Sequence, residues 1–177
     1  MADLLEALLQ IKALAGTPGR AARLLAAADP RRWRVRRTPS ERSPVELLAH
    51  LADAEATYLA SVRLILDRER PAIPAVAAAG PGATRAGDPA AELERFAARR
   101  SETVALLGAC SAAPLERSGV HPVRRLVPVA DVVAIMLAHD TDHMAQISDR
   151  LADASPGAGP LRPPGASDPG TTGGRRG

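Results

Sequence analysis

Apolar residues recur every three or four positions over five stretches of the chain, and segments rich in glycine, proline and alanine separate these stretches. Such periodicity is typical of amphipathic helices. It predicts helices over residues 3–15, 20–28, 44–68, 88–110 and 128–152. Residues 16–19, Gly-Thr-Pro-Gly, interrupt the first two, which therefore form either one kinked helix or two short ones.

Two of the long helices begin with a recognisable cap. Ser43 is a natural N-cap, Pro44 suits the first helical position, and Glu46 completes a capping box. Asp88 followed by Pro89 repeats the combination of cap and proline. These residues predict where both helices begin.

The segments between and after the helices divide the chain. An Ala/Gly/Pro-rich linker leads to Gly87 and is expected to run over the outside of the fold, and residues 111–127 form a second connecting segment. From about Ser155 onward large apolar residues are almost absent, so burial cannot offset the entropy of ordering. We expect one folded domain over residues 1–153 and a disordered Gly/Pro-rich tail over residues 154–177.

Composition favours an all-α fold. Of the 177 residues, 46% are hydrophobic but only 2% are aromatic, so the apolar content is mainly alanine, leucine and valine. Four principal helices with one long crossover connection describe a four-helix bundle, in which sites are built from side chains on facing helices. The single cysteine, Cys110, excludes an internal disulfide. No signal peptide is evident and no stretch reaches membrane-spanning length, so a cytoplasmic protein without a membrane partner is expected.

The charge of the chain gives little support for a nucleic-acid partner. The 23 basic residues are nearly balanced by 20 acidic ones, which leaves a net charge of +3. One basic cluster surrounds Trp33 and could bind phosphates, although a solvated loop between helices is the favoured interpretation. It consists of Arg31, Arg32, Arg34, Arg36 and Arg37. The chain lacks a helix-turn-helix signature and has too few aromatic residues for base stacking.

Histidines provide the candidate chemistry. His139 and His143 are four residues apart on one predicted helix, so their imidazoles leave the same side about 6 Å apart and could share a cation. Two ligands seldom hold a divalent metal. His50, level with Tyr58 on the buried face of its helix, is the best third ligand, whereas His121 lies in a turn-like segment and is weaker. Taken singly, each could instead be a hydrogen-bonded structural residue.

Several segments together resemble the DinB-like superfamily over about residues 5–151. They are residues 43–55 (Ser-Pro-Val-Glu-Leu-Leu-Ala-His-Leu-Ala-Asp-Ala-Glu), Phe96-x-x-x-Arg100, residues 117–121 (Arg-Ser-Gly-Val-His) and residues 138–147 (Ala-His-Asp-Thr-Asp-His-Met-Ala-Gln-Ile). The resemblance implies a four-helix bundle, often dimeric, in which His50, His139 and His143 bind a divalent metal such as zinc or nickel. A homodimer is therefore a possible assembly.

The resemblance also implies an activity. Characterised branches of the superfamily are thiol S-transferases or isomerases that use bacillithiol, mycothiol or glutathione, and some members are hydrolases. A metal held by three neutral imidazoles lowers the pKa of a bound water or thiol, which gives a nucleophile near neutral pH. A low-molecular-weight thiol and an electrophile are the implied small-molecule partners. A non-catalytic, stress-associated bundle that binds a metal or a small molecule remains the alternative.

Two departures from the family pattern bear on the substrate. The Trp-Ser pair that usually precedes the first histidine helix is replaced by Arg42-Ser43, with Trp33 well upstream. Residues 124–128, Arg-Arg-Leu-Val-Pro, lack the glycine often found after the Gly-x-His segment. Neither change removes a metal ligand, but the lining of the site could differ from that of relatives.

Four further residues could support the site. Gln146 could reach the face of His143, and Glu46 and Asp142 could orient a ligating imidazole, although the helix cap explains Glu46 and a solvated face explains Asp142. Arg100 could neutralise an anionic substrate, and a surface salt bridge is an equal alternative.

Other enzyme classes fit the sequence less well. A gluzincin-like peptidase requires glutamate directly after His139, where the chain has Asp140. An HD-type phosphohydrolase requires a further aspartate in a folded helix, and Asp149 and Asp153 follow too closely. A DNA-associated damage-response role has only the arginine cluster as support.

Overall fold

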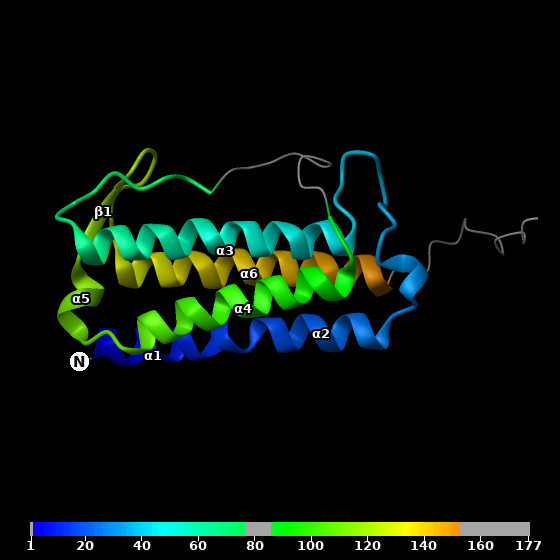
Figure 1. Cartoon of the computed structure of the whole chain (residues 1–177), viewed down its shortest axis with the longest axis horizontal. Helices are drawn as coiled ribbons and strands as arrows, with labels where there is room; N and C mark the ends of the chain where they lie inside the picture. The colour runs from blue at the N-terminus through cyan, green and yellow to red at the C-terminus, as the bar shows by residue number, and fades with distance from the viewer. Residues whose placement is uncertain (1, 77–85, 153–177) are drawn as a thin grey trace, which may run out of the picture.

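The molecule is a four-helix bundle in which the first rod consists of two helices set end to end (Figure 1). The computed structural model describes residues 2–76 and 86–152, so the predicted disordered tail and the middle of the linker lie outside the described residues. The rods are α1 with α2, α3, α4 and α6; their bounds are Ala2–Ala15, Thr17–Ala27, Pro44–Asp67, Pro89–Gly108 and Val129–Ala152. The predicted all-α bundle is thereby confirmed.

The first rod contains two short helices, one of the two predicted alternatives. Gly16 between them has helical backbone angles, φ −79° and ψ −15°, and its carbonyl accepts a hydrogen bond from the Arg20 amide at 3.1 Å. Thr17 and Pro18 occupy the first turn of α2, where the missing amide of proline is tolerated. Gly16 therefore separates the two helices, and Thr17, Pro18 and Gly19 form the start of α2.

Both predicted caps are present. The Ser43 hydroxyl accepts from the Glu46 amide at 3.4 Å, and the Glu46 carboxylate accepts from the Ser43 amide at 2.8 Å. At the start of α4 the Asp88 carboxylate accepts from the amides of Ala90 and Ala91.

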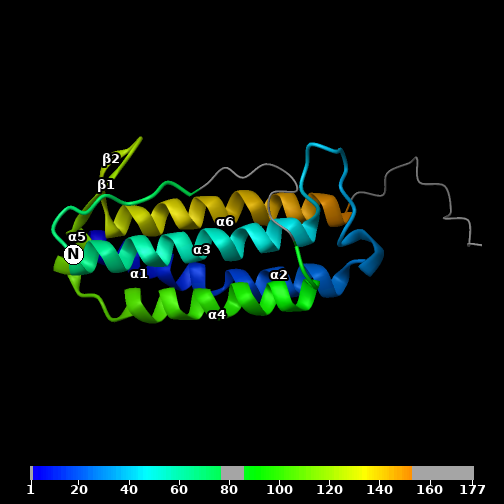
Figure 2. The same ribbon diagram turned by 45° about the horizontal axis from the view of Figure 1, so that its top comes forward.

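Helices α3 and α4 run in the same direction (Figure 2). Asp53 pairs with Arg95 and, further along both helices, Arg63 pairs with Glu102. A parallel pair requires a connection that returns over the length of the bundle, as the predicted long crossover does. Residues 68–76 leave the end of α3 and run back along the bundle, and residues 86–88 lead into the start of α4 (Figure 1).

A β-hairpin, which the sequence analysis did not predict, lies at one end of the bundle. Residues 111–127, expected to be a plain connection, contain the short helix α5 (Ala112–Glu116) and most of the antiparallel strands β1 (Ser118–His121) and β2 (Arg125–Pro128). Four-residue strands are too short to show an alternating pattern. The Val120 amide donates to the Pro71 carbonyl at 2.7 Å, which ties the hairpin to the chain that leaves α3.

Two residues adapt the hairpin to its place. A Cβ at Gly119 would lie 2.8 Å from Cγ2 of Ile73 and 2.9 Å from Cγ1 of Ile65, so glycine permits close packing against α3. Arg125 follows the turn with a left-handed φ of 66°, a conformation that favours glycine.

The interior contains two apolar clusters with a polar layer between them. Cluster one lies near the hairpin and includes Leu14, Val62, Ile65, Leu107, Val133 and Met136. Cluster two lies at the opposite end and includes Leu25, Leu47, Leu51, Phe96, Ile147 and Leu151. Between them the helices contribute His50, Glu55, Arg100, His139, Asp140 and His143. No helix in the described ranges combines the length and apolar character needed to cross a bilayer.

Candidate metal centre and cavity

Three histidines from two helices meet in the polar layer. His50 on α3 and His139 and His143 on α6 each offer one ring nitrogen, and the three nitrogens lie within 4.8 Å of one another. The Nε2 atoms of His50 and His139 are 3.2 Å apart. The structure thus brings together the three residues selected from the sequence, and their role as metal ligands remains a prediction.

Local sequence explains the position of each ring. The four-residue spacing puts His139 and His143 on one face of α6, with their ring centroids 4.4 Å apart. His50 is 6% exposed and lies two turns inside the capped start of α3, which packs antiparallel to α6. The capping box therefore sets the register of His50 against the histidine pair.

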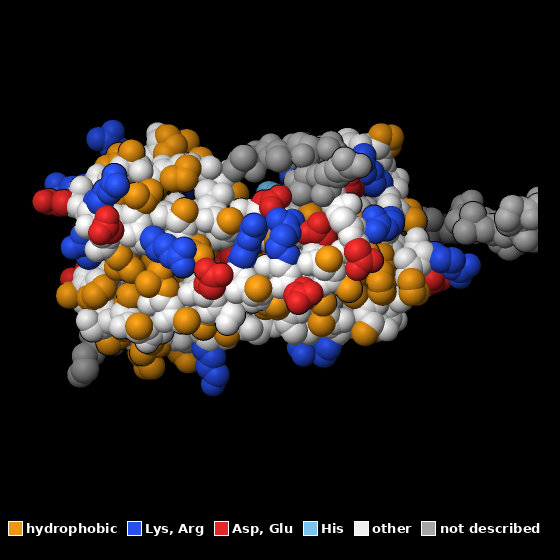
Figure 3. Space-filling model, in the orientation of Figure 1, with side chains coloured by type: hydrophobic (Ala, Val, Ile, Leu, Met, Phe, Trp, Pro, Cys, Tyr) orange, Lys and Arg blue, Asp and Glu red, His pale blue; other side chains and the backbone are white. Residues whose placement is uncertain are grey.

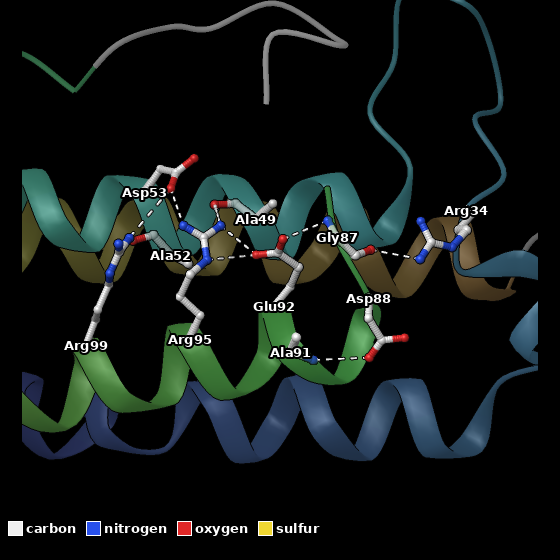
Figure 4. Close-up of polar contacts among 10 residues, drawn as sticks. All are labelled: Arg34, Ala49, Ala52, Asp53, Gly87, Asp88, Ala91, Glu92, Arg95 and Arg99. Carbon is white, nitrogen blue, oxygen red and sulfur yellow. Dashed lines mark hydrogen bonds and ion pairs between the residues drawn. The ribbon is translucent and has the colours of Figure 1, made fainter. Parts of the chain in front are cut away.

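Arginines of α4 hold the turn of α3 that carries His50 (Figure 4). Arg95 donates to the Ala49 carbonyl at 3.2 Å and Arg99 donates to the Ala52 carbonyl at 2.6 Å. Both arginines also pair with Asp53, and Arg95 pairs with Glu92. Basic and acidic side chains consequently gather along the contact between α3 and α4, on the face seen in Figure 3. These contacts between α3 and α4 hold α3 in place from the side that faces away from the histidines.

All three imidazoles are neutral at physiological pH. Burial, with the positive charge of Arg42 adding to it, lowers the pKa of His50 to about 4. Burial also lowers the pKa of His139 to about 3, and neighbouring imidazoles contribute. The pKa of His143 is lowered chiefly by burial, and the neighbouring Gln146 opposes the change. Neutral rings leave nitrogen lone pairs available, the state that metal binding requires.

The donor set fits a divalent cation. Tetrahedral Zn–N bonds of about 2.0–2.1 Å put ligand nitrogens about 3.3 Å apart, close to the 3.2 Å between His50 and His139. Nδ1 of His143 is buried and has no hydrogen-bond partner in the described part of the chain. Trp33, Glu55 and Arg100 each have a buried atom in the same state, so this nitrogen by itself does not identify a ligand site. Three imidazoles with an open side suit zinc or nickel.

A cavity of about 780 Å³ lies beside the cluster, and all three histidines line it. Its walls are largely apolar, from Ile73 and Val76 after α3 and from Val132 and Ile135 on α6. Cavities of this volume accept small organic molecules. Cys110 is not among the lining residues, so the only thiol of the protein lies outside this cavity.

Tyr58 is a cavity residue that the sequence analysis did not assign to the site. Its ring meets His139 edge-on, with centroids 5.9 Å apart. Burial, reinforced by Asp140 and Glu55, raises its pKa to about 12, so its hydroxyl remains a hydrogen-bond donor at neutral pH. Tyr58 is eight residues after His50, and this spacing of two helical turns could have identified it.

Arg100 lies in the interior, not at the surface or in the cavity. Its guanidinium donates at 2.6 Å to both Asp140 and Glu55, and all three side chains are at most 3% exposed. It also donates to the Leu14 carbonyl at 2.9 Å. Both sequence-based alternatives for Arg100 were therefore wrong. Because Asp140 pairs with Arg100, it does not stand beside His139 as the base that a gluzincin would need.

Glu46 serves the helix cap and not the histidines. Besides capping Ser43, its carboxylate pairs with Arg36, which lowers the pKa of Glu46 to about 2. The idea that Glu46 orients an imidazole is therefore wrong. Asp142 is exposed and lines the cavity, and Gln146 lies beside His143 and accepts from Arg150 at 3.3 Å.

The arginine cluster around Trp33 is engaged within the chain. Arg31 pairs with Asp29, Arg36 with Glu46 and Arg37 with Glu41. Arg32 donates to the Leu151 carbonyl at 2.9 Å and Arg34 to the Gly87 carbonyl at 2.8 Å. The cluster therefore fastens the loop before α3 to the bundle.

His121 lines the cavity but stands outside the group of three. Arg42 and Arg124, which the sequence analysis noted only as departures from a family pattern, line the cavity as well. Neither arginine had a sequence signal for this position, because the hairpin and the loop before α3 bring them there.

Comparison with known proteins agrees with this architecture. A family model described as the DinB superfamily matches residues 13–147, a range that contains His50, His139 and His143. YfiT from Bacillus subtilis, described as a probable metal-dependent hydrolase with an unusual four-helix bundle topology, superposes with a TM-score of 0.71 at 18% identity, over 80% of this chain and 83% of YfiT. No curated protein matches. Since the family model covers most of the sequence, the chain belongs to the DinB superfamily.

Proposed function

We propose that this protein is a divalent-metal-dependent enzyme that acts on a small molecule, with His50, His139 and His143 as the metal ligands. The observation that carries the proposal is the meeting of three neutral imidazoles at the wall of a cavity of about 780 Å³. Zinc or nickel is the expected cation, because imidazole nitrogen suits both metals.

Hydrolysis and thiol S-transfer are the two proposed reaction types. A cation held by three imidazoles acts as a Lewis acid and activates water or a thiol near neutral pH. The fold similarity to YfiT favours hydrolysis, since that protein is described as a probable metal-dependent hydrolase. Membership of the superfamily supports transfer from a low-molecular-weight thiol to an electrophile. The large cavity has room for either pair of reactants.

Metal analysis tests the proposal. Protein purified without a histidine tag is analysed by plasma mass spectrometry and compared with His50→Ala, His139→Ala and His143→Ala, with His121→Asn as the control. We expect near-stoichiometric metal in the native protein and the control, and loss in the three alanine variants. The loaded protein is then assayed on activated esters with and without added thiols. Absence of metal after incubation with zinc, nickel or manganese would overturn the proposal, whereas bound metal without turnover of any ester or thiol would favour the non-catalytic alternative.

We also propose a cytoplasmic homodimer without a nucleic-acid partner. The internal partners of the arginine cluster support the last point. Leu5, Leu8 and Leu9 form an apolar patch on α1, with 61%, 41% and 59% of their surface exposed, and such patches commonly mediate association. Sedimentation of the native protein and of Leu5→Glu tests the dimer, and a monomeric native protein would overturn it. Anisotropy titration with DNA at near-physiological salt tests the absence of nucleic-acid binding.

A further inference from the structure

We propose that His121 and Arg124, at the turn of the hairpin, bind a carboxylate group of the substrate. This inference rests on the proposed function, because the ligand is a substrate only if the protein is the proposed enzyme. It adds that the substrates are apolar carboxylates. Both residues line the cavity that contains the three histidines. They come from one turn, so one small element would recognise the anionic end of a ligand.

Hydrogen bonding fixes which nitrogen of His121 is available. Nδ1 accepts from the backbone amides of Val123 and Arg124, both at 3.1 Å. An amide can only donate, so Nδ1 is the acceptor and the proton of the neutral ring is on Nε2. His121 therefore offers the cavity a hydrogen-bond donor.

Arg124 supplies a positive charge beside that donor. In the described part of the chain its side chain makes no ion pair or hydrogen bond, although most arginines of the bundle have such partners. Its charge acts on Tyr58, where it opposes the rise in the pKa of the hydroxyl caused by burial. Tyr58 in turn packs against His139. Arg124 is thus within electrostatic reach of the candidate metal centre.

The remaining lining defines the rest of the ligand. One guanidinium and one neutral N–H match a single negative charge with two acceptor oxygens, as in a carboxylate. Among the described residues that line the cavity, Asp142 is the only acidic one, and Arg42 adds a second positive charge near His50. Ile73, Val127 and Val132 contribute apolar side chains to the same lining. A ligand with an apolar body and a terminal carboxylate would match both the apolar lining and the pair of His121 and Arg124.

Calorimetric titration of a matched pair of probes tests the inference. The probes are 4-phenylbutyrate and its neutral amide, 4-phenylbutanamide, each titrated into zinc-loaded and into metal-free protein. We expect the carboxylate to bind about tenfold more tightly than the amide in both forms, since a charge-assisted contact contributes on the order of 1.5 kcal/mol. Arg124→Gln and His121→Asn should each abolish the preference. Asparagine keeps an acceptor for the two turn amides but lacks the Nε2 proton.

Arg125→Gln is the matched control, because Arg125 follows in the same hairpin, is exposed and does not line the cavity. It should keep the full preference. If the preference disappears with the metal and survives in Arg124→Gln, the carboxylate binds the cation and the inference is overturned. If Arg42→Gln were the only variant to lose the preference for the carboxylate, the inference would be overturned as well. A protein that binds no metal but retains the preference would refute the proposed enzyme and leave the carboxylate site standing.

Discussion

Two polar clusters lie side by side in the middle of the bundle, and adjacent residues of α6 belong to different clusters. Asp140 belongs to the buried triad with Glu55 and Arg100, in which each charged group has an ionic partner. His139 belongs to the histidine cluster, where the one hydrogen bond among the rings joins His50 and His139. Both clusters contain buried atoms without a hydrogen-bond partner in the described part of the chain, Oε1 of Glu55 and Nε of Arg100 in the triad and Nδ1 of His143 among the rings. They differ in charge, because the triad pairs its ions with one another whereas the three rings are neutral. The comparison separates an ionic group that lies away from the cavity from a group of neutral rings that lines it.

Removal of Arg100 should have the largest effect. Arg100→Met leaves two carboxylates buried without their cation, and we expect the free energy of unfolding to fall by about 3–5 kcal/mol. Chemical denaturation measures the change. Arg63→Met is the control, because the pair of Arg63 with Glu102 is exposed and should contribute less than about 1 kcal/mol.

A second variant sharpens the same test. Replacing the whole triad, by Glu55→Leu, Arg100→Met and Asp140→Leu together, should recover much of the lost stability, because no buried charge remains. If Arg100→Met were as stable as Arg63→Met but failed to bind zinc, the triad would belong to the site and the distinction between the clusters would be wrong.

Zinc should stabilise the protein through the histidine cluster alone. At a free concentration of about one hundred times Kd, a ligand that binds only the native state adds about 2.7 kcal/mol, which raises Tm by roughly 5–10 °C for a domain of this size. Thermal denaturation with and without zinc measures the shift. His143→Ala should lose it and His121→Asn should keep it. A shift that survives in His143→Ala would indicate binding elsewhere.

Acid should destabilise the metal-free protein through the same rings. The pKa of His50 is lowered to about 4 and that of His139 to about 3, against 6.5 in the unfolded chain. Above pH 6.5 the rings are neutral in both states. As the pH falls from 6.5 toward 4 the unfolded state takes up protons that the folded state refuses, so stability declines.

Denaturation midpoints across this pH range measure the slope, which His139→Gln should reduce. Tyr58→Phe is the matched control, because Tyr58 lines the same cavity and its pKa of about 12 lies outside the range. An equal slope in His139→Gln and in the native protein would contradict the assignment of the effect to the histidine cluster.

The sequence predicted the parts of the bundle that depend on local spacing. Caps at Ser43 and Asp88 act within one helical turn, and the pair His139 and His143 needs only a helix to share a face. Adding His50 to this pair as a third candidate ligand required the further assumption that α3 and α6 face one another. The family resemblance named the same three residues, and the match over residues 13–147 agrees with it.

Positions that depend on distant contacts could not be predicted in this way. Arg100 meets Glu55 and Asp140, which lie 45 and 40 residues away along the chain. Its spacing from Phe96 and Leu107 puts it on the buried face of α4, but the two carboxylates that it would meet there could not be read from its own helix. His121 reaches the cavity only because the hairpin packs against the chain after α3, where Gly119 allows close approach. Such placements follow from tertiary packing and not from periodicity.

The smallest expected effect concerns an exposed counterpart of the triad. Asp53 pairs with Arg95 and Arg99 between the same two helices that bring Glu55 and Arg100 together, but its side chain is 49% exposed (Figure 4). Asp53→Asn should therefore lower the free energy of unfolding by less than about 1 kcal/mol, and the difference should vanish at about 1 M salt, where charges are screened within about 3 Å. Denaturation at low and high salt measures both values. Because both networks join a carboxylate of α3 to an arginine of α4, a cost of about 3–5 kcal/mol would show that burial is not what separates them.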